Sequence, residues 1–184
     1  MRWTALFADL EAQLEAAERG ELAAEVADRS RREAALVPAG DRLAAAVGAQ
    51  VGVTVVGAGA VSGRLVDTGP DWLLLEEVGR RELLVPWPAV LSVSGLGART
   101  REPGAVGEVA ARLDLRWALR GLARSRAGLS VVLRDGTVHA GTLDRVGADH
   151  VELAGHPAGE ARRAAAVRDV VLLPLDALAV LRQV

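Results

Sequence analysis

The 184-residue chain contains no cysteine, lysine, isoleucine, asparagine or tyrosine. Without cysteine, a disulfide framework and thiolate chemistry are excluded, and the composition fits a reducing cytoplasm. The chain has no apolar run near the ~20 residues of a membrane span. Its N-terminus has no apolar segment of the signal-peptide kind. These absences predict a soluble cytoplasmic protein.

Charge is unevenly distributed along the chain, although the formal net charge is only −2 at pH 7. Residues 96–128 contain seven arginines against Glu102, Glu108 and Asp114, whereas residues 1–50 contain more acids than arginines. Every basic side chain other than histidine is arginine, which is typical of coding bias in a high-GC genome. A protein whose whole surface binds polyanions is usually more basic than this one.

The sequence contains an internal duplication. The segment GTLDRVGADHVEL at 141–153 resembles GRLVDTGPDWLLL at 63–75, with an offset of 78 residues. A later block recurs at an offset of 88 residues, in which Leu84, Pro86 and Ala89 return as Leu172, Pro174 and Ala177. The difference between the offsets indicates an insertion at about 155–164. Such self-similarity indicates that one structural unit is encoded twice.

The first 36 residues have the periodicity of a helix. Apolar residues at alternating steps of four and three form a narrow seam, made of Trp3, Phe7, Leu10, Leu14 and Ala17. Gly20 disfavours the helix by ~1 kcal/mol relative to alanine. We expect the seam to dock on the rest of the chain or to form a local helical hairpin. The alternative is a coiled coil that dimerises the protein.

Short strands alternate with turns in both repeats. Gly57, Gly59 and Gly63 do not match the dinucleotide-binding fingerprint, since Gly57 aligns with Asp135 of an Asp-Gly hairpin turn. Glycine in mid-strand, at Gly63 and its equivalent Gly141, marks a sharp bend or close packing. In the first repeat, period-two alternation predicts strands at about 51–55, 61–67, 72–77, 82–87 and 90–94.

These patterns predict an α+β protein, in which N-terminal helices precede two repeated five-stranded antiparallel barrels, each preceded by a helix. The two helices that precede the barrels are expected at 41–47 and at about 108–126. The predicted organisation is a helical segment at 1–48, a first barrel at 49–96, a linker at 97–107, and a helix with the second barrel at 108–184.

The order of elements resembles the Sm-like fold, a member of the SH3-like barrel group. The run VVLRDGTVHAGTLDRVGADHVEL at 131–153 is similar to the first Sm motif, and LVPWPAVLSV and LLPLDALAVL are similar to the second. The resemblance implies barrels that pair edge strand to edge strand, and it implies RNA binding. The sequence departs from the family where Sm proteins hold RNA, because it has no asparagine and has Ser94, Gly95 and Arg182 in the second motif.

PRC-barrel domains resemble the V-P-x-x-A-V corner at 85–90 about equally well. This second resemblance implies protein partners or ribosomal components. The whole arrangement also resembles proteins of actinobacteria, which implies a source and no activity.

No arrangement of residues indicates catalysis, because no Ser, His and Asp set accompanies a nucleophile elbow. Asp71 and Asp149, at equivalent turn positions, are expected to cap their own turns. A group of acids and histidines meets no metal-site spacing and is interpreted as a surface cluster, made of Asp149, His150, Glu152 and His156. We therefore predict no enzymatic activity, no metal, no cofactor and no small-molecule substrate.

Two candidate binding surfaces remain. The first is nucleic-acid-binding, since guanidinium groups suit phosphate; it consists of Arg112, Arg116, Arg120, Arg124 and Arg126. A solvated charged helix face is the competing interpretation. The second is partner-binding and consists of Trp72 and Trp87, which the second repeat replaces by His150 and Leu175. For these rings, packing in the core is the competing interpretation.

We therefore predict a non-enzymatic binding or scaffold module that contacts a protein partner or self-associates, because small sheets leave edges that pair with neighbours. RNA binding by the arginine-rich helix is the alternative. The position of the arginines distinguishes the two hypotheses. RNA binding needs them to face solvent, and it is excluded if they lie beneath the acidic N-terminal helix.

Overall fold

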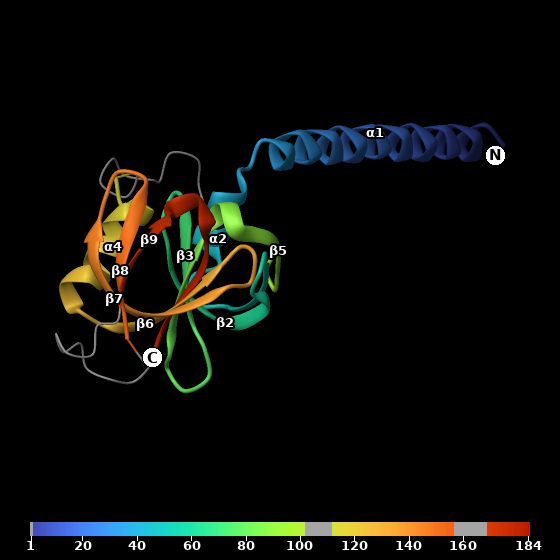
Figure 1. Cartoon of the computed structure of the whole chain (residues 1–184). Coiled ribbons are helices and arrows are strands. Elements are labelled where there is room, and N and C mark those ends of the chain that lie inside the picture. The colour runs from blue at the N-terminus through green and yellow to red at the C-terminus, as the bar shows by residue number, and fades with distance from the viewer. Residues whose placement is uncertain (1, 102–111, 157–168) are drawn as a thin grey trace. The chain divides into compact units, whose positions relative to one another are not determined.

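The computed structural model describes residues 2–101, 112–156 and 169–184. The chain divides into two compact units, Met1–Pro38 and Ala39–Val184. The first unit is one long helix, and the second contains every described strand (Figure 1). Within the described residues, no helix has the length and apolar character needed to cross a membrane.

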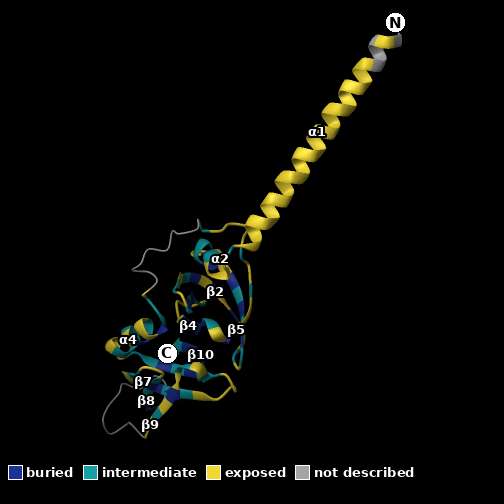
Figure 2. Ribbon diagram, turned by 90° about the horizontal axis from the view of Figure 1, so that it is seen from above, coloured by how far each residue is buried: buried dark blue, intermediate teal, exposed yellow. Residues whose placement is uncertain are grey.

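The first unit consists of helix α1 (Arg2–Ala35), which runs through Gly20 without a break. A local helical hairpin therefore does not form, because the ~1 kcal/mol cost of one glycine is small beside the hydrogen bonds of so long a helix. The helix is exposed along its described length (Figure 2). The side chains of Trp3, Phe7, Leu10 and Leu14 are between 51% and 72% exposed.

The second unit is built on one antiparallel sheet of ten strands, in the order β5-β1-β2-β3-β4-β10-β6-β7-β8-β9. The strands of the first repeat are β1 (Gln50–Val55), β2 (Gly59–Thr68), β3 (Trp72–Glu76), β4 (Glu82–Pro86) and β5 (Val90–Ser94). Those of the second repeat are β6 (Gly128–Leu133), β7 (Val138–Val146), β8 (His150–Gly155), β9 (Asp169–Pro174) and β10 (Leu178–Gln183).

The expectation of two closed five-stranded barrels is wrong, although the α+β class is correct. Strands β4 and β10 pair, with Leu84 opposite Leu181 and Leu83 opposite Arg182, so the two repeats share one open sheet. The physical reason is burial: Leu84 is 4% exposed and Leu181 is 1% exposed at this joint. Pairing the two strands also satisfies backbone groups that would otherwise lie at an open edge of each repeat.

The duplication is visible in the backbone. Within each repeat the strands lie in the same order, with the fifth beside the first and the fourth at the far side. Equivalent hydrogen bonds recur: the Trp87 amide donates to the Asp71 carbonyl at 2.8 Å, and the Leu175 amide donates to the Asp149 carbonyl at 2.8 Å. The two repeats therefore fold alike and are joined through one pair of strands.

Gly63 lies where β2 passes close to β3. A Cβ atom at this position would come within 2.6 Å of the Glu76 carbonyl oxygen. The strand register shifts just beyond it, between Leu65 and Asp67. The mid-strand glycine thus permits a bend, as the sequence predicted.

Two hydrophobic cores lie against the sheet, and each includes residues from both repeats. The first contains Leu43 of helix α2 (Ala39–Ala45) and extends to Ala179 and Val180 of β10. The second belongs mainly to the second repeat but includes Trp72 and Leu84 of the first. The β4–β10 joint is therefore part of both cores.

Helix α4 (Leu115–Ser125) starts later than the predicted helix at 108–126. Residues 108–111 lie outside the described residues, and Arg112 lies in a turn. The helix begins at Leu115 because the Asp114 side chain accepts a hydrogen bond from the Trp117 amide at 2.9 Å, as an N-cap does. Much of the predicted insertion at 155–164 and part of the linker at 97–107 also lie outside the described residues.

Candidate functional site

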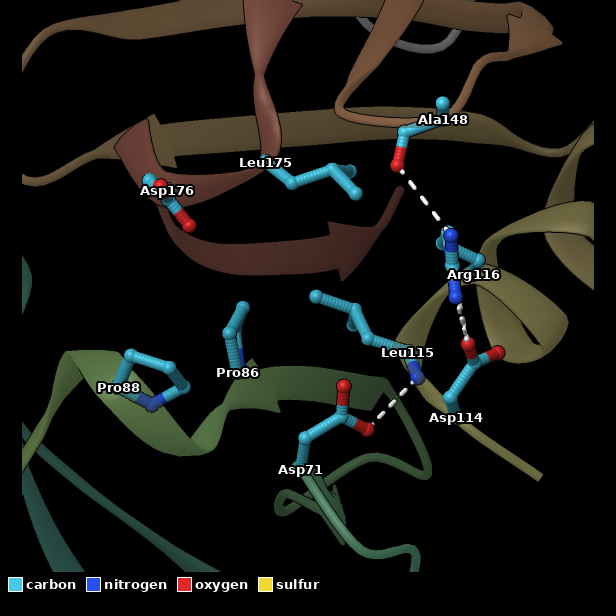
Figure 3. A pocket seen from close by; sticks show the side chains of 9 residues that line it. All are labelled: Asp71, Pro86, Pro88, Asp114, Leu115, Arg116, Ala148, Leu175 and Asp176. Atoms are coloured by element: carbon cyan, nitrogen blue, oxygen red, sulfur yellow. Dashed lines mark hydrogen bonds and ion pairs between the residues drawn. The ribbon is translucent and has the colours of Figure 1, made fainter. Parts of the chain in front are cut away.

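The turn before β3 docks on the start of α4 (Figure 3). The Asp71 carboxylate accepts a hydrogen bond from the Leu115 amide at 2.7 Å. Beside it, the Trp72 indole Nε1 donates to the Leu113 carbonyl at 2.7 Å. The side chain of Asp71 therefore caps a helix that is distant in sequence.

The two tryptophans predicted to bind a partner differ in burial. Trp72 is 4% exposed and belongs to the second core. Trp87 begins the short 3-10 helix η1 (Trp87–Ala89) and packs, half-buried, against the first core. This placement favours the packing interpretation, because the two rings do not form an exposed aromatic surface.

A pocket of about 230 Å³ lies beside the start of α4 (Figure 3). On one side, Arg116 donates to the Asp114 carboxylate at 2.9 Å and to the Ala148 carbonyl at 3.4 Å. The pocket is shared between the repeats, because it is lined by Asp71, Pro86, Pro88, Asp114, Leu115, Arg116, Ala148, Leu175 and Asp176. Asp176 is part of the second 3-10 helix, η2 (Leu175–Ala177).

The two acids nearest the helix start differ in their ionisation. Burial raises the pKa of Asp71, the Leu115 amide opposes that shift, and the charge of Asp114 adds to it. For Asp114, burial opposes ionisation, but the Trp117 amide and Arg116 together lower its pKa. Arg116 thus forms its ion pair with Asp114. No group of three His, Cys, Asp or Glu residues within the described ranges could hold a metal ion.

All five arginines of the predicted nucleic-acid surface are exposed. They do not form one continuous row, because Arg112 lies in a turn and Arg126 is the C-cap of α4 in a left-handed conformation. Arg120 and Arg124 lie on the outer face of the helix, whose inner face buries Leu115 and Leu119.

The histidines of the predicted surface cluster have separate surroundings. His156 is 4% exposed, and its Nε2 lies 2.8 Å from the Thr142 hydroxyl. His150 lies 2.8 Å, through its Nδ1, from the Asp149 carboxylate. That hydrogen bond lowers the pKa of Asp149. The interpretation of a surface cluster is therefore wrong for His156, which is buried against Thr142.

The sheet ends in two strands, β5 and β9, that have a partner on one side only among the described strands. Leu91 of β5 is 67% exposed, and Val170 and Leu172 of β9 are each 58% exposed. Sequence reasoning predicted open edges in general but did not single out these residues. The 88-residue offset aligns Leu172 with Leu84, but only the structure shows that Leu84 is buried and Leu172 exposed.

No protein-family model matches the chain, and a comparison with curated proteins finds no match.

Proposed function

We propose that this protein is a self-associating scaffold module whose copies join edge to edge, through β9 of one copy and β5 of the next. The observation that supports the proposal is the joint between β4 and β10 inside each chain. By the duplication, β9 is the equivalent of β4 and β5 is the equivalent of β10. Each sheet therefore ends in the same two kinds of edge that already pair at its centre.

The inner joint specifies the register expected between copies. Inside the chain, Leu84 lies opposite Leu181. The 88-residue offset converts this pair into Leu172 of one copy opposite Val93 of the next. Such a contact is head-to-tail, so it produces a ring or a filament according to the rotation between copies.

Burial at equivalent positions supports the same contact. Leu84 is 4% exposed at the inner joint and Ala179 of β10 is fully buried in the first core, whereas their equivalents Leu172 and Leu91 are 58% and 67% exposed. Burial of apolar surface is worth roughly 25 cal/mol per Å², so covering these side chains would favour association.

The sequence of β5 is also unusual for a free edge. Proteins usually protect such an edge with charged residues or proline, yet β5 reads VLSVS and has neither.

One feature of the inner joint is absent from the outer edges. Arg182 of β10 donates to Glu77 at 3.1 Å across the joint. Ser94 occupies the position equivalent to Arg182, so this ion pair has no counterpart at β5. We therefore expect association between copies to be weaker than the inner joint, and reversible.

Analytical ultracentrifugation over a range of concentrations tests the proposal. The parent protein is expected to associate, and Leu91→Glu or Leu172→Glu is expected to shift it towards the monomer, because each change places a charge on an edge. The matched control is Val78→Glu, since Val78 is apolar and 94% exposed but lies in the turn between β3 and β4. Equal effects of all three substitutions would contradict edge pairing.

RNA binding remains a second candidate, favoured by the exposure of Arg116, Arg120 and Arg124. Its test is the anisotropy of a labelled single-stranded RNA at low and physiological salt, because phosphate contacts release counterions and weaken as salt rises. The triple alanine variant at these positions is expected to lose binding. If the protein binds no RNA even at low salt, RNA binding is excluded and the scaffold proposal is the one that stands.

The cytoplasmic location remains a prediction from the composition.

A further inference from the structure

Helix α1 presents an exposed apolar surface with acidic flanks. Trp3, Phe7, Leu10 and Leu14 are at least 51% exposed. The chain has four acids and no basic residue between Arg2 and Arg19: Asp9, Glu11, Glu15 and Glu18. Helices gain most of their stability from packing of an apolar face, so this surface fits a partner that is apolar at its centre and basic around it.

The outer face of α4 has that chemistry. Trp117 is 46% exposed there, and Arg120 and Arg124 lie three and seven residues further along the helix. Between them is Gly121, where an added Cβ would meet no atom within 4 Å. This glycine leaves room for another helix to approach closely, with the indole ring on one side and guanidinium groups around it.

The spacing of charges on the two helices is compatible. Helices rise about 1.5 Å per residue, so Glu11 to Glu15 and Arg120 to Arg124 each span about 6 Å. Packed helix axes lie about 8–10 Å apart, which is within reach of Glu and Arg side chains. Two acids can therefore face two arginines while the apolar residues between them meet.

We infer that α1 of one copy docks on the outer face of α4 of a second copy. In this contact Phe7 and Leu10 pack around Trp117, and Glu11 and Glu15 lie opposite Arg120 and Arg124. The contact uses neither β5 nor β9, so it stands independently of the proposed edge pairing. It also gives Arg120 and Arg124 of α4 a protein partner.

A charge-swap experiment tests the inference in the full-length Leu172→Glu background, in which edge pairing is removed. One variant adds Glu11→Arg and Glu15→Arg, and a second adds Arg120→Glu and Arg124→Glu. Each variant alone has like charges on α1 and α4, so its association constant is expected to fall about tenfold from that of the Leu172→Glu protein. In an equimolar mixture the basic α1 of one variant meets the acidic α4 of the other, and association is expected to return.

Sedimentation equilibrium at low salt measures these constants, with circular dichroism to verify that every variant is folded. The matched control is Arg80→Glu with Arg81→Glu, which changes the net charge equally in another exposed turn and is expected to leave association unchanged. A mixture that associates no better than its components overturns the inference, as does a Leu172→Glu protein that is wholly monomeric. If the mixture stays unassociated but binds RNA through Arg120 and Arg124, the outer face of α4 is a nucleic-acid surface instead.

Discussion

The Asp71 carboxylate accepts a hydrogen bond from the backbone amide of Leu115 at 2.7 Å. A turn of the first repeat thereby caps the helix that precedes the second. The equivalent residue, Asp149, pairs with His150 in its own turn. The repeats thus share their backbone hydrogen bonds, whereas their side chains have acquired different partners.

Replacing Asp71 tests the helix cap. Asp71→Ala removes the acceptor of the Leu115 amide and is expected to lower the free energy of unfolding by ~1 kcal/mol. Asp71→Asn keeps a side-chain oxygen and is expected to change it by less. Urea unfolding at neutral pH measures both values, and equal losses for the two variants would argue against the hydrogen bond.

The raised pKa of Asp71 predicts a pH dependence. A carboxyl group whose folded pKa lies above its unfolded value of ~4 stabilises the fold most below that value, and this contribution is lost as pH rises through the folded pKa. The stability of the parent protein minus that of Asp71→Asn should therefore be largest below the unfolded pKa of ~4 and fall as pH rises above it. Asp114 is present in both proteins, so only its interaction with the charge of Asp71 enters the difference. A difference that rises with pH would contradict the shift.

Trp72 and Trp117 should respond differently to replacement by phenylalanine. Trp72→Phe removes the donor to the Leu113 carbonyl in a buried site and is expected to cost ~1–3 kcal/mol of unfolding free energy. Trp117→Phe changes a ring that is 46% exposed and is expected to change stability by ~0.5 kcal/mol or less. Unfolding followed by circular dichroism gives both numbers, and similar costs would contradict a stabilising role for the buried hydrogen bond of Trp72 to Leu113.

Two glycines are expected to respond to alanine with opposite signs. Gly63→Ala would place a Cβ within 2.6 Å of the Glu76 carbonyl oxygen, so β2 must shift, at a cost of ~1–3 kcal/mol. Gly20→Ala meets no atom within 4 Å and should stabilise α1 by ~1 kcal/mol. Thermal unfolding of the sheet reports the first change, and helical ellipticity at low denaturant reports the second. A stable Gly63→Ala protein would mean that the bend tolerates a side chain.

The ion pair across the β4–β10 joint can be measured directly. Arg182 and Glu77 have side chains 34% and 22% exposed, respectively. A double-mutant cycle with Arg182→Ala and Glu77→Ala is expected to give a coupling energy of ~0.5–1 kcal/mol that decreases with salt. The pair Arg29–Glu33 on α1, 80% and 67% exposed, is the control and should couple more weakly. Zero coupling energy between Arg182 and Glu77 would mean that this ion pair does not stabilise the joint.

Much of the fold was predictable because the signals are local. Period-two alternation located the strands of the first repeat within one or two residues at most ends, and β5 at Val90–Ser94 matches its prediction fully. The hairpin turn at Gly57 and Gly59 was also predicted, from its alignment with the Asp-Gly turn of the second repeat. In the structure both glycines adopt positive φ angles, of 74° and 75°. Helix α4 was longer in the prediction because Asp114 was not recognised as its N-cap.

The sequence by itself determined the duplication, the strands and turns of the first repeat, and the helical character of the first 36 residues with their apolar seam; that α1 continues through Gly20 was seen only in the structure. Only the tertiary structure decided that β4 pairs with β10, that Trp72 is buried and that Asp71 caps α4. The reason is that these features depend on segments distant in the chain. Leu84 and Leu172 stand in similar local sequences, so no local pattern could show that the first is covered by β10 while the second remains at an open edge.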